Sequence, residues 1–158
     1  MFIYSVHGST VKFFSVLFAC VAILVAAVAF IPAVSAKPAA YEEAGVKFED
    51  VKTNEDRIAF LSQFGWDVVP QCVEEVGVTI PADFDRVFVG YNQIQKEQGL
   101  DLSAYRRKEV TRYTYEVTNY PDYEGKVLAN VLVYRGNVIG GDICSEAKDG
   151  FVHGFSRG

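Results

Sequence analysis

The feature that most constrains this chain is an uninterrupted apolar run from Phe13 to Ile31, in which no residue carries a formal charge. At about 1.5 Å per residue, a helix of this length nearly spans the roughly 30 Å hydrocarbon core of a bilayer. A helix also satisfies its own backbone hydrogen bonds there. The run therefore predicts a single membrane-spanning helix, with residues 1–12 as a cytoplasmic tail and everything after the helix extracytoplasmic.

The same layout also fits an export signal that is removed. Val34, Ser35 and Ala36 are the small residues that a signal peptidase prefers, so cleavage after Ala36 would release a secreted protein. Against cleavage, the apolar run is longer than the 7–15 residues typical of a signal peptide and reaches the length of a permanent anchor. A retained anchor and a removed signal both stay open, and both place the remaining chain outside the cytoplasm.

The charge balance bears on the class of partner. The sequence has 15 Lys and Arg against 20 Asp and Glu, a formal net charge of −5. Nucleic-acid binding needs a concentrated basic face, so this acidic balance argues against a nucleic-acid partner. The basic cluster after the membrane run is Arg106, Arg107 and Lys108. It is typical of a solvated turn, and the alternative is a binding site for an anionic group.

The chain after the membrane run divides into a linker at residues 32–52 and a domain at 53–158. Few large apolar residues occur in the linker, which predicts flexible spacing. Thr53 is suited to cap a helix over residues 54–64, with Glu55 and Asp56 in its first turn opposing the helix dipole. Trp66 follows this helix directly, and we expect it to be a buried anchor.

The middle of the domain contains an interrupted extended stretch and a longer helix. Residues 67–79 are rich in valine but contain Pro70 and Gly77, which predicts an edge strand or two short extended pieces. Pro81 occupies the position of a first helical residue, and the helix should end at Gly99. The face toward the sheet is predicted to consist of residues at helical spacing: Phe84, Val87, Phe88, Tyr91, Ile94 and Gln95 or Gln98.

Three strand-like segments close the chain, at residues 110–119, 127–134 and 138–144. The first alternates, with Tyr113, Tyr115 and Val117 on a dry face and the intervening residues on a wet one. The second is apolar on both faces except for Asn130, which marks it as a central strand. Residues 135–137 predict a tight hairpin in which Gly136 and Asn137 tolerate positive φ. The predicted fold class is α+β, a two-layer domain of two helices packed on an antiparallel β-meander.

Several motifs in this part of the chain occur in a fixed order. They are Asn54–Leu61 with Phe64–Trp66, Tyr91–Lys96 with Gln98–Leu102, Arg112–Val117, and Val138–Cys144. Together they resemble an uncharacterised bacterial family described as a domain of unknown function, over roughly residues 53–155. The resemblance implies an exported, membrane-tethered domain of Gram-positive bacteria and implies no activity. In that family we expect a glycine in the turn after Tyr105, where this chain has Arg107.

Few residues suit catalysis or metal binding. His153 is the one histidine after the membrane run, so no clustered histidine metal site is expected, and no cofactor motif is present. A hydrolase remains an alternative in which Ser145 is the nucleophile, His153 the base and Asp142 the residue that orients the imidazole. Since no nucleophile-elbow pattern surrounds Ser145, we expect the domain not to be an enzyme.

Two cysteines, Cys72 and Cys144, follow the membrane run. An oxidising exterior would allow them to pair, and the chain-entropy model credits a loop of this length with roughly 4 kcal/mol. A disulfide and two separate thiols both remain open, because the sequence does not show whether their Cβ atoms meet.

Tyrosines give the clearest indication of binding, because a flat ring with a hydroxyl stacks on sugars or anchors a protein partner. Tyr120 and Tyr123 flank a turn and are the predicted contact residues. The sequence thus favours a non-enzymatic module anchored in the cell membrane that binds an envelope protein or glycan. The rival interpretations are a regulatory module acting on a membrane partner and the hydrolase.

Overall fold

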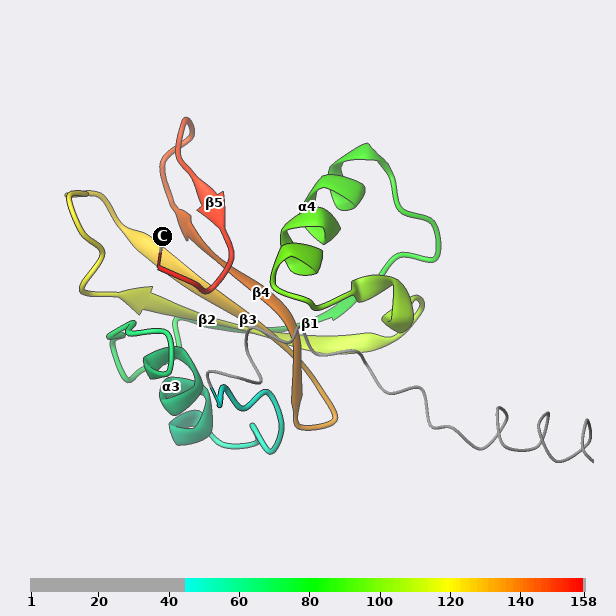
Figure 1. The fold of residues 1–158 in the computed structure, drawn as a ribbon, viewed down its shortest axis with the longest axis horizontal. Coiled ribbons are helices and arrows are strands. Elements are labelled where there is room, and N and C mark those ends of the chain that lie inside the picture. The colour runs from blue at the N-terminus through cyan, green and yellow to red at the C-terminus, as the bar shows by residue number, and fades with distance from the viewer. Residues whose placement is uncertain (1–44, 158) are drawn as a thin grey trace, which may run out of the picture. The chain divides into compact units, whose positions relative to one another are not determined.

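A computed structural model describes residues 45–157. Its elements are α3 (Asn54–Ser62), β1 (Glu74–Thr79), α4 (Arg86–Glu97), the 3-10 turn η1 (Leu102–Tyr105), β2 (Glu109–Val117), β3 (Val127–Tyr134), β4 (Asn137–Ser145) and β5 (Val152–His153). The strands form one antiparallel sheet in the order β1-β2-β3-β4-β5 (Figure 1). The predicted α+β class and antiparallel meander are confirmed.

The predicted tail, membrane segment and cleavage site lie outside the described residues. So does the first part of the predicted linker, residues 32–44. From residue 45 to residue 157, the helices are too short or too polar to cross a bilayer.

The two helices lie on opposite faces of the sheet (Figure 1). On one face, here called the α3 face, Phe60 and Leu61 pack in a core cluster with Tyr115 and Val131. On the other, the α4 face, the core cluster contains Val110, Leu132 and Ile139, with Phe88 and Tyr91 of α4 against it. The sheet is therefore the middle of three layers, and the two-layer arrangement predicted from the sequence is wrong. A cover on both faces explains why β3 is apolar on both.

Helix α3 begins as predicted. The Thr53 side chain accepts a hydrogen bond from the Asp56 N–H, and the Asp56 carboxylate accepts one from the Thr53 N–H, which completes a capping box. Hydrogen bonds from the Thr53 and Lys52 N–H groups lower the pKa of Asp56. From the buried side of α3, Arg57 donates to the Tyr115 hydroxyl at 2.7 Å and lies over the Tyr113 ring. This contact fixes α3 to the middle of β2.

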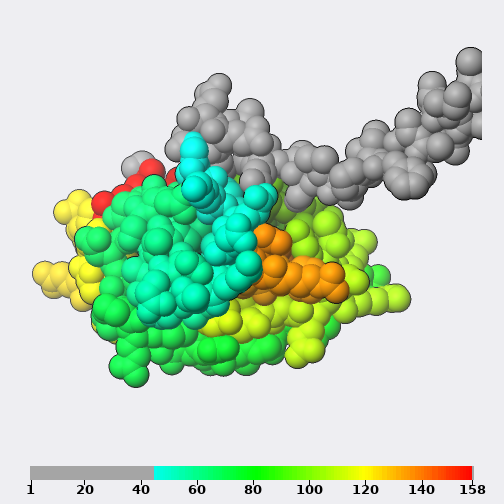
Figure 2. Space-filling model, turned by 90° about the horizontal axis from the view of Figure 1, so that it is seen from below, coloured from blue at the N-terminus to red at the C-terminus, as the bar shows by residue number. Residues whose placement is uncertain are grey.

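The predicted linker is not flexible where the structure describes it. Phe48 and Val51 are each only 4 % exposed and belong to the core on the α3 face. The Val51 N–H donates to the Gly136 carbonyl at 2.8 Å, and the Val138 N–H donates to the Phe48 carbonyl at 2.7 Å. Seen from below, segment 45–52 and α3 form a continuous cover beside the β3–β4 turn (Figure 2). The compact domain thus starts before residue 53.

Helix α4 begins five residues later than Pro81, because Asp85 caps it by accepting from the Phe88 N–H. This start leaves Val87 on the outer side, 80 % exposed, although the sequence placed it on the buried face. The side chains that α4 buries completely are polar ones, Asn92 and Gln95. The predicted end is confirmed, since Gly99 follows the cap residue with a φ of 65°.

The strands follow the predicted segments closely, with three differences. The wet face predicted for β2 is largely covered, since Thr114 is only 4 % exposed beneath the α4 side. In the β3–β4 hairpin, positive φ angles occur at Arg135 and Gly136, whereas Asn137 already starts β4. The short strand β5, which pairs with Ile143 and Cys144, was not predicted.

The turn before β2 gives a first testable prediction. Arg107 has a φ of 62°, a left-handed conformation that favours glycine, and this is the position where the family resemblance led us to expect one. Arg107→Gly is therefore expected to raise the free energy of unfolding by about 0.5–1 kcal/mol in urea titrations. Arg106→Gly is the matched control, because Arg106 has a φ of −50°, and it should lower stability. Equal effects of the two changes would contradict the strain argument.

Candidate functional site

A row of polar side chains crosses the α4 face of the sheet. Thr114 of β2 lies opposite Asn130 of β3, and Asn130 lies opposite Asp142 of β4. The Thr114 hydroxyl donates to the Asn130 Oδ1 at 2.8 Å, and the Asn130 Nδ2 donates to the Asp142 Oδ1 at 3.0 Å. Because adjacent strands hold these residues in register, the row is a rigid hydrogen-bonded line across three strands.

Tyr91 of α4 contacts the last residue of this row, Asp142. Its hydroxyl donates to the Asp142 Oδ2 at 2.8 Å. Burial, together with the nearby Asp142 carboxylate, raises the pKa of Tyr91 well above its ordinary value of 10, so the phenol remains a donor at neutral pH. Among residues 45–157, the Asp142 carboxylate thus has Asn130 and Tyr91 as donors and also bonds to the Cys144 thiol, which leaves one of its four lone-pair directions.

Around Asp142 lies a pocket of about 240 Å³, here called the Asp142 pocket. Its lining residues come from β1 and the residue after it, from α4, and from β2, β3 and β4: Val78, Thr79, Ile80, Phe88, Tyr91, Arg112, Asn130, Leu132 and Asp142. Most of the lining is apolar, and the charged groups are Arg112 and Asp142. Such a combination of an apolar wall with a few convergent polar groups is typical of small-molecule sites.

Arg112 supplies a hydrogen-bond donor without an acceptor. Its terminal nitrogen pairs with the Glu74 carboxylate at the sheet surface. Its Nε is buried and has no hydrogen-bond partner within residues 45–157. A buried N–H that lacks an acceptor is costly, so a ligand that supplied one would gain affinity. The lining of the Asp142 pocket therefore includes one side chain with an unpaired buried donor, Arg112, and one with an acceptor direction left over, Asp142.

Cys144 lies next to this row and is not a nucleophile. Burial, followed by the Asp142 charge, raises the pKa of its thiol to about 11. The thiolate is the reactive form of cysteine, and this environment disfavours it.

The predicted contact residue Tyr120 is half-buried and is part of an aromatic stack. Its ring lies 5.5 Å from that of Trp66 at an angle of 4°, and 4.6 Å from that of Phe151. Trp66 is 1 % exposed and donates to the Phe155 carbonyl, so its predicted role as a buried anchor is confirmed. Tyr123 packs edge-on against Tyr120. These rings pack against the core on the α3 face.

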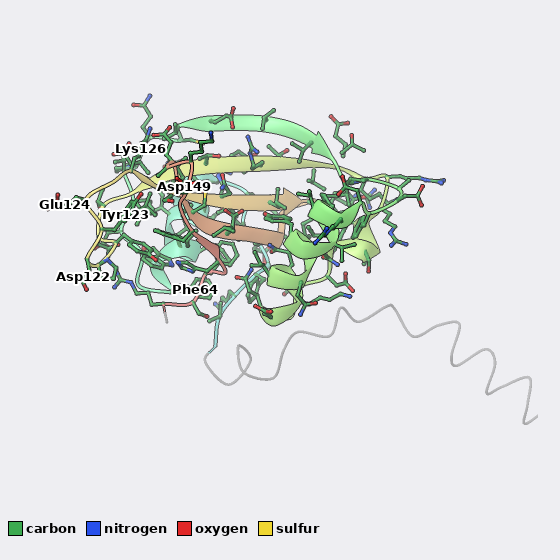
Figure 3. All side chains as sticks on the ribbon, turned by 90° about the horizontal axis from the view of Figure 1, so that it is seen from above. Phe64, Asp122, Tyr123, Glu124, Lys126 and Asp149 are labelled. Atoms are coloured by element: carbon green, nitrogen blue, oxygen red, sulfur yellow. The ribbon has the colours of Figure 1, made fainter. Side chains whose placement is uncertain are left out.

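The two predicted contact regions are not brought together. Arg106, Arg107 and Lys108 precede the first residue of β2, whereas Tyr120 and Tyr123 follow its last residue, so they lie at opposite ends of the strand. In Figure 3, Tyr123 lies on the loop at the end of the sheet away from α4. Arg106 packs over the Phe84 ring and lines a separate polar depression beside α4. None of these residues lines the Asp142 pocket.

The structure does not assemble the residues of the hydrolase alternative. The Ser145 hydroxyl accepts from the Phe151 N–H. The two ring nitrogens of His153 lie 3.1 Å from the Tyr120 hydroxyl and 2.7 Å from the Gly154 carbonyl oxygen. His153 pairs with Ile143, whose side chain is in the core of the α3 face, whereas Asp142 points to the α4 face. The interpretation of these three residues as a triad is therefore wrong.

The disulfide alternative fails for the same topological reason. Cys72 packs against the core on the α3 face, and Cys144 lies beside Asn130 on the α4 face. Both are free thiols, and the sheet separates them. Among residues 45–157, no three His, Cys, Asp or Glu side chains are grouped as a metal site requires.

One feature of the sequence points to the Asp142 pocket. Asn130 interrupts a strand that is otherwise apolar on both faces, and a buried polar residue in a central strand needs partners. Its partners Thr114 and Asp142 lie sixteen and twelve positions away, so their identity depends on strand register, and the contact of Asp142 with Tyr91 depends on helix placement.

Comparison with known proteins gives one family and no characterised relative. Residues 60–143, more than half of the chain, match the family model described as Domain of unknown function (DUF4830). No curated protein and no solved structure matches the chain.

Proposed function

Because this chain belongs to the family Domain of unknown function (DUF4830), whose description names no activity, we propose a function from the chain's own geometry. The protein is a non-enzymatic binding module that takes a group of an envelope protein or glycan into the Asp142 pocket. The apolar run Phe13–Ile31 holds the module at the outer face of the cell membrane.

The observation that carries this proposal is that one pocket contains an unpaired hydrogen-bond donor, an acceptor with a direction left over, and an apolar wall. Arg112, which lines the pocket, has a buried Nε–H without an acceptor among the described residues, and Asp142 has one lone-pair direction beyond those used by Asn130, Tyr91 and Cys144. Val78, Ile80 and Leu132 supply apolar surface around them. Recognition needs this combination, whereas catalysis needs a nucleophile or base, and the nearby thiol of Cys144 is held protonated.

Photo-crosslinking in intact cells tests the site. The full chain would carry p-benzoylphenylalanine at Phe88, which lines the pocket, or at Tyr123, at the far end of the sheet. We expect a partner to crosslink at Phe88 and not at Tyr123, and Asp142→Asn should abolish the Phe88 product. Crosslinking at Tyr123 alone, or at neither position, would overturn the pocket as the binding site.

Protease treatment of the same cells tests the location. An extracytoplasmic domain is digested by protease added to cells whose outer face is accessible and whose cytoplasmic membrane is intact. Digestion that occurs only after the cytoplasmic membrane is broken would overturn the extracytoplasmic placement.

A further inference from the structure

The charges in the Asp142 pocket restrict the ligand. An anionic group that approached the free Arg112 N–H would also meet the carboxylates of Asp142 and of Glu74, which pairs with Arg112. A cationic group that approached Asp142 would meet the guanidinium of Arg112 in the same small space. Arg112 and Glu74 compensate each other, which leaves the negative charge of Asp142. An anionic group would add to this charge, and a cationic group offers no acceptor and would leave the Arg112 Nε–H unpaired.

A neutral group with one hydrogen-bond donor and one acceptor satisfies both the Arg112 N–H and the Asp142 carboxylate. A secondary amide has this pattern, because its carbonyl oxygen accepts from the Arg112 Nε and its N–H donates to a free lone pair of Asp142. The apolar wall formed by Val78, Ile80 and Leu132 then suits a methyl group attached to the amide carbon. The volume of about 240 Å³ is below the ~300–1,000 Å³ of drug-sized sites, so the pocket accepts one small unit of a longer ligand.

A peptide main chain is a poor source of this amide. The pocket lies on the face of the sheet, between Arg112 and Asn130 below and Phe88 and Tyr91 of α4 at its side. Backbone N–H and C=O groups of a sheet point along the sheet plane toward neighbouring strands and not out of its face. A bound peptide would leave its adjacent amides without backbone partners, whereas an acetylated sugar carries a single amide on a ring of hydroxyl groups.

From these observations we propose that the Asp142 pocket binds the acetamido group of an N-acetylated amino sugar, so that the envelope ligand is a glycan. This inference rests on the proposed binding function and names its ligand class. The acetyl methyl lies against the apolar wall, and the sugar ring lies beside the exposed Thr79 and the half-buried Phe88. Flat aromatic surfaces such as that of Phe88 favour contact with the apolar face of a sugar ring.

Saturation-transfer NMR on the full chain in lipid nanodiscs tests the proposal. The probes are N-acetylglucosamine, glucosamine, glucose and N-acetylalanine methylamide, the last as a peptide analogue. We expect N-acetylglucosamine to bind at least tenfold more tightly than the other three, because a site built to pair buried polar groups rejects analogues that leave them unpaired. Its acetyl methyl should receive the strongest saturation.

Matched variants locate the binding. Asp142→Asn and Arg112→Lys should each weaken N-acetylglucosamine binding at least tenfold. Asp149→Asn and Arg135→Lys change residues that line neither the Asp142 pocket nor the depression beside α4, and they should stay within twofold. Should Asp142→Asn fail to fold, Arg112→Lys still carries the test. Tighter binding of glucosamine would show that charge pairing dominates and would overturn the proposal.

Two further outcomes separate this inference from the proposed function. Binding of the peptide analogue alone, or of no probe while Phe88 still crosslinks to a partner, would overturn the sugar assignment and leave the binding module standing. Failure of both the probes and the Phe88 crosslink would overturn both.

Discussion

Replacing Trp66 by alanine is expected to lower the free energy of unfolding by about 3–5 kcal/mol, the usual cost of truncating a buried large aromatic side chain. Trp66 is 1 % exposed, donates its indole N–H to the Phe155 carbonyl at 2.6 Å and stacks on Tyr120. The Arg157 guanidinium carbon lies over the indole ring at 4.5 Å. The indole therefore joins α3, the β2–β3 loop and the C-terminal residues, and its loss leaves a cavity and an unpaired carbonyl.

Urea unfolding followed by far-UV circular dichroism measures this change. Trp66→Phe keeps most of the ring volume but not the N–H, so its cost should be smaller, about 1–3 kcal/mol. Val152→Ala, at a side chain 49 % exposed, should stay within about 0.5 kcal/mol. Equal costs for Trp66→Ala and Val152→Ala would mean that the stack does not stabilise the domain.

Local patterns predicted local structure well. The Thr53 cap, the Gly99 helix stop and the bounds of β3 agree with the sequence analysis, because each depends on residues close together in the chain. The late start of α4 shows how one local signal can mislead. Pro81 fits a first helical position, but Asp85 has a side chain that caps the helix directly, and this cap determines where the helix begins.

The site depends on relations that no local pattern contains. Tyr113 and Tyr115 predicted one buried face of β2, but only the position of α4 shows that the other face is covered as well. The sequence showed Asn130 as a polar exception in an apolar strand. Its contact with Asp142 could be predicted only from the β3–β4 register, and the contact of Asp142 with Tyr91 only from the position of α4 above the sheet. Likewise, Tyr120 was predicted to be a contact residue because it flanks a turn, and its stacking on Phe151 and Trp66 from distant segments was not visible in the sequence.

The β4 residue next to Asp142 connects the fold to the site. The Gly141 N–H donates to Gln95 Oε1 at 2.8 Å, and its carbonyl accepts from Gln98 Nε2 at 3.1 Å. Both glutamines are buried and belong to the last turn and cap of α4. These two hydrogen bonds fix the end of α4 to β4, and this docking holds Tyr91, one helical turn earlier, against Asp142.

Gly141→Ala is expected to lower the free energy of unfolding by at least about 3 kcal/mol, through steric overlap together with backbone strain. A Cβ at this position would lie 2.2 Å from the Asn130 carbonyl oxygen and 2.3 Å from a ring atom of Phe155, and the φ of 155° is one that side chains rarely adopt. Gly90→Ala is the matched control, because a Cβ there meets nothing within 4 Å, and it should raise stability by about 0.5–1 kcal/mol. Both are measured by urea unfolding.

The double variant Gly141→Ala/Phe155→Leu should recover little of the lost stability, since the backbone oxygen cannot move away from the Cβ. Full recovery would contradict the assignment of the clash to the backbone. Where the Gly141→Ala protein still folds, displacement of α4 should separate Tyr91 from Asp142, so the Phe88 crosslink should be lost as well.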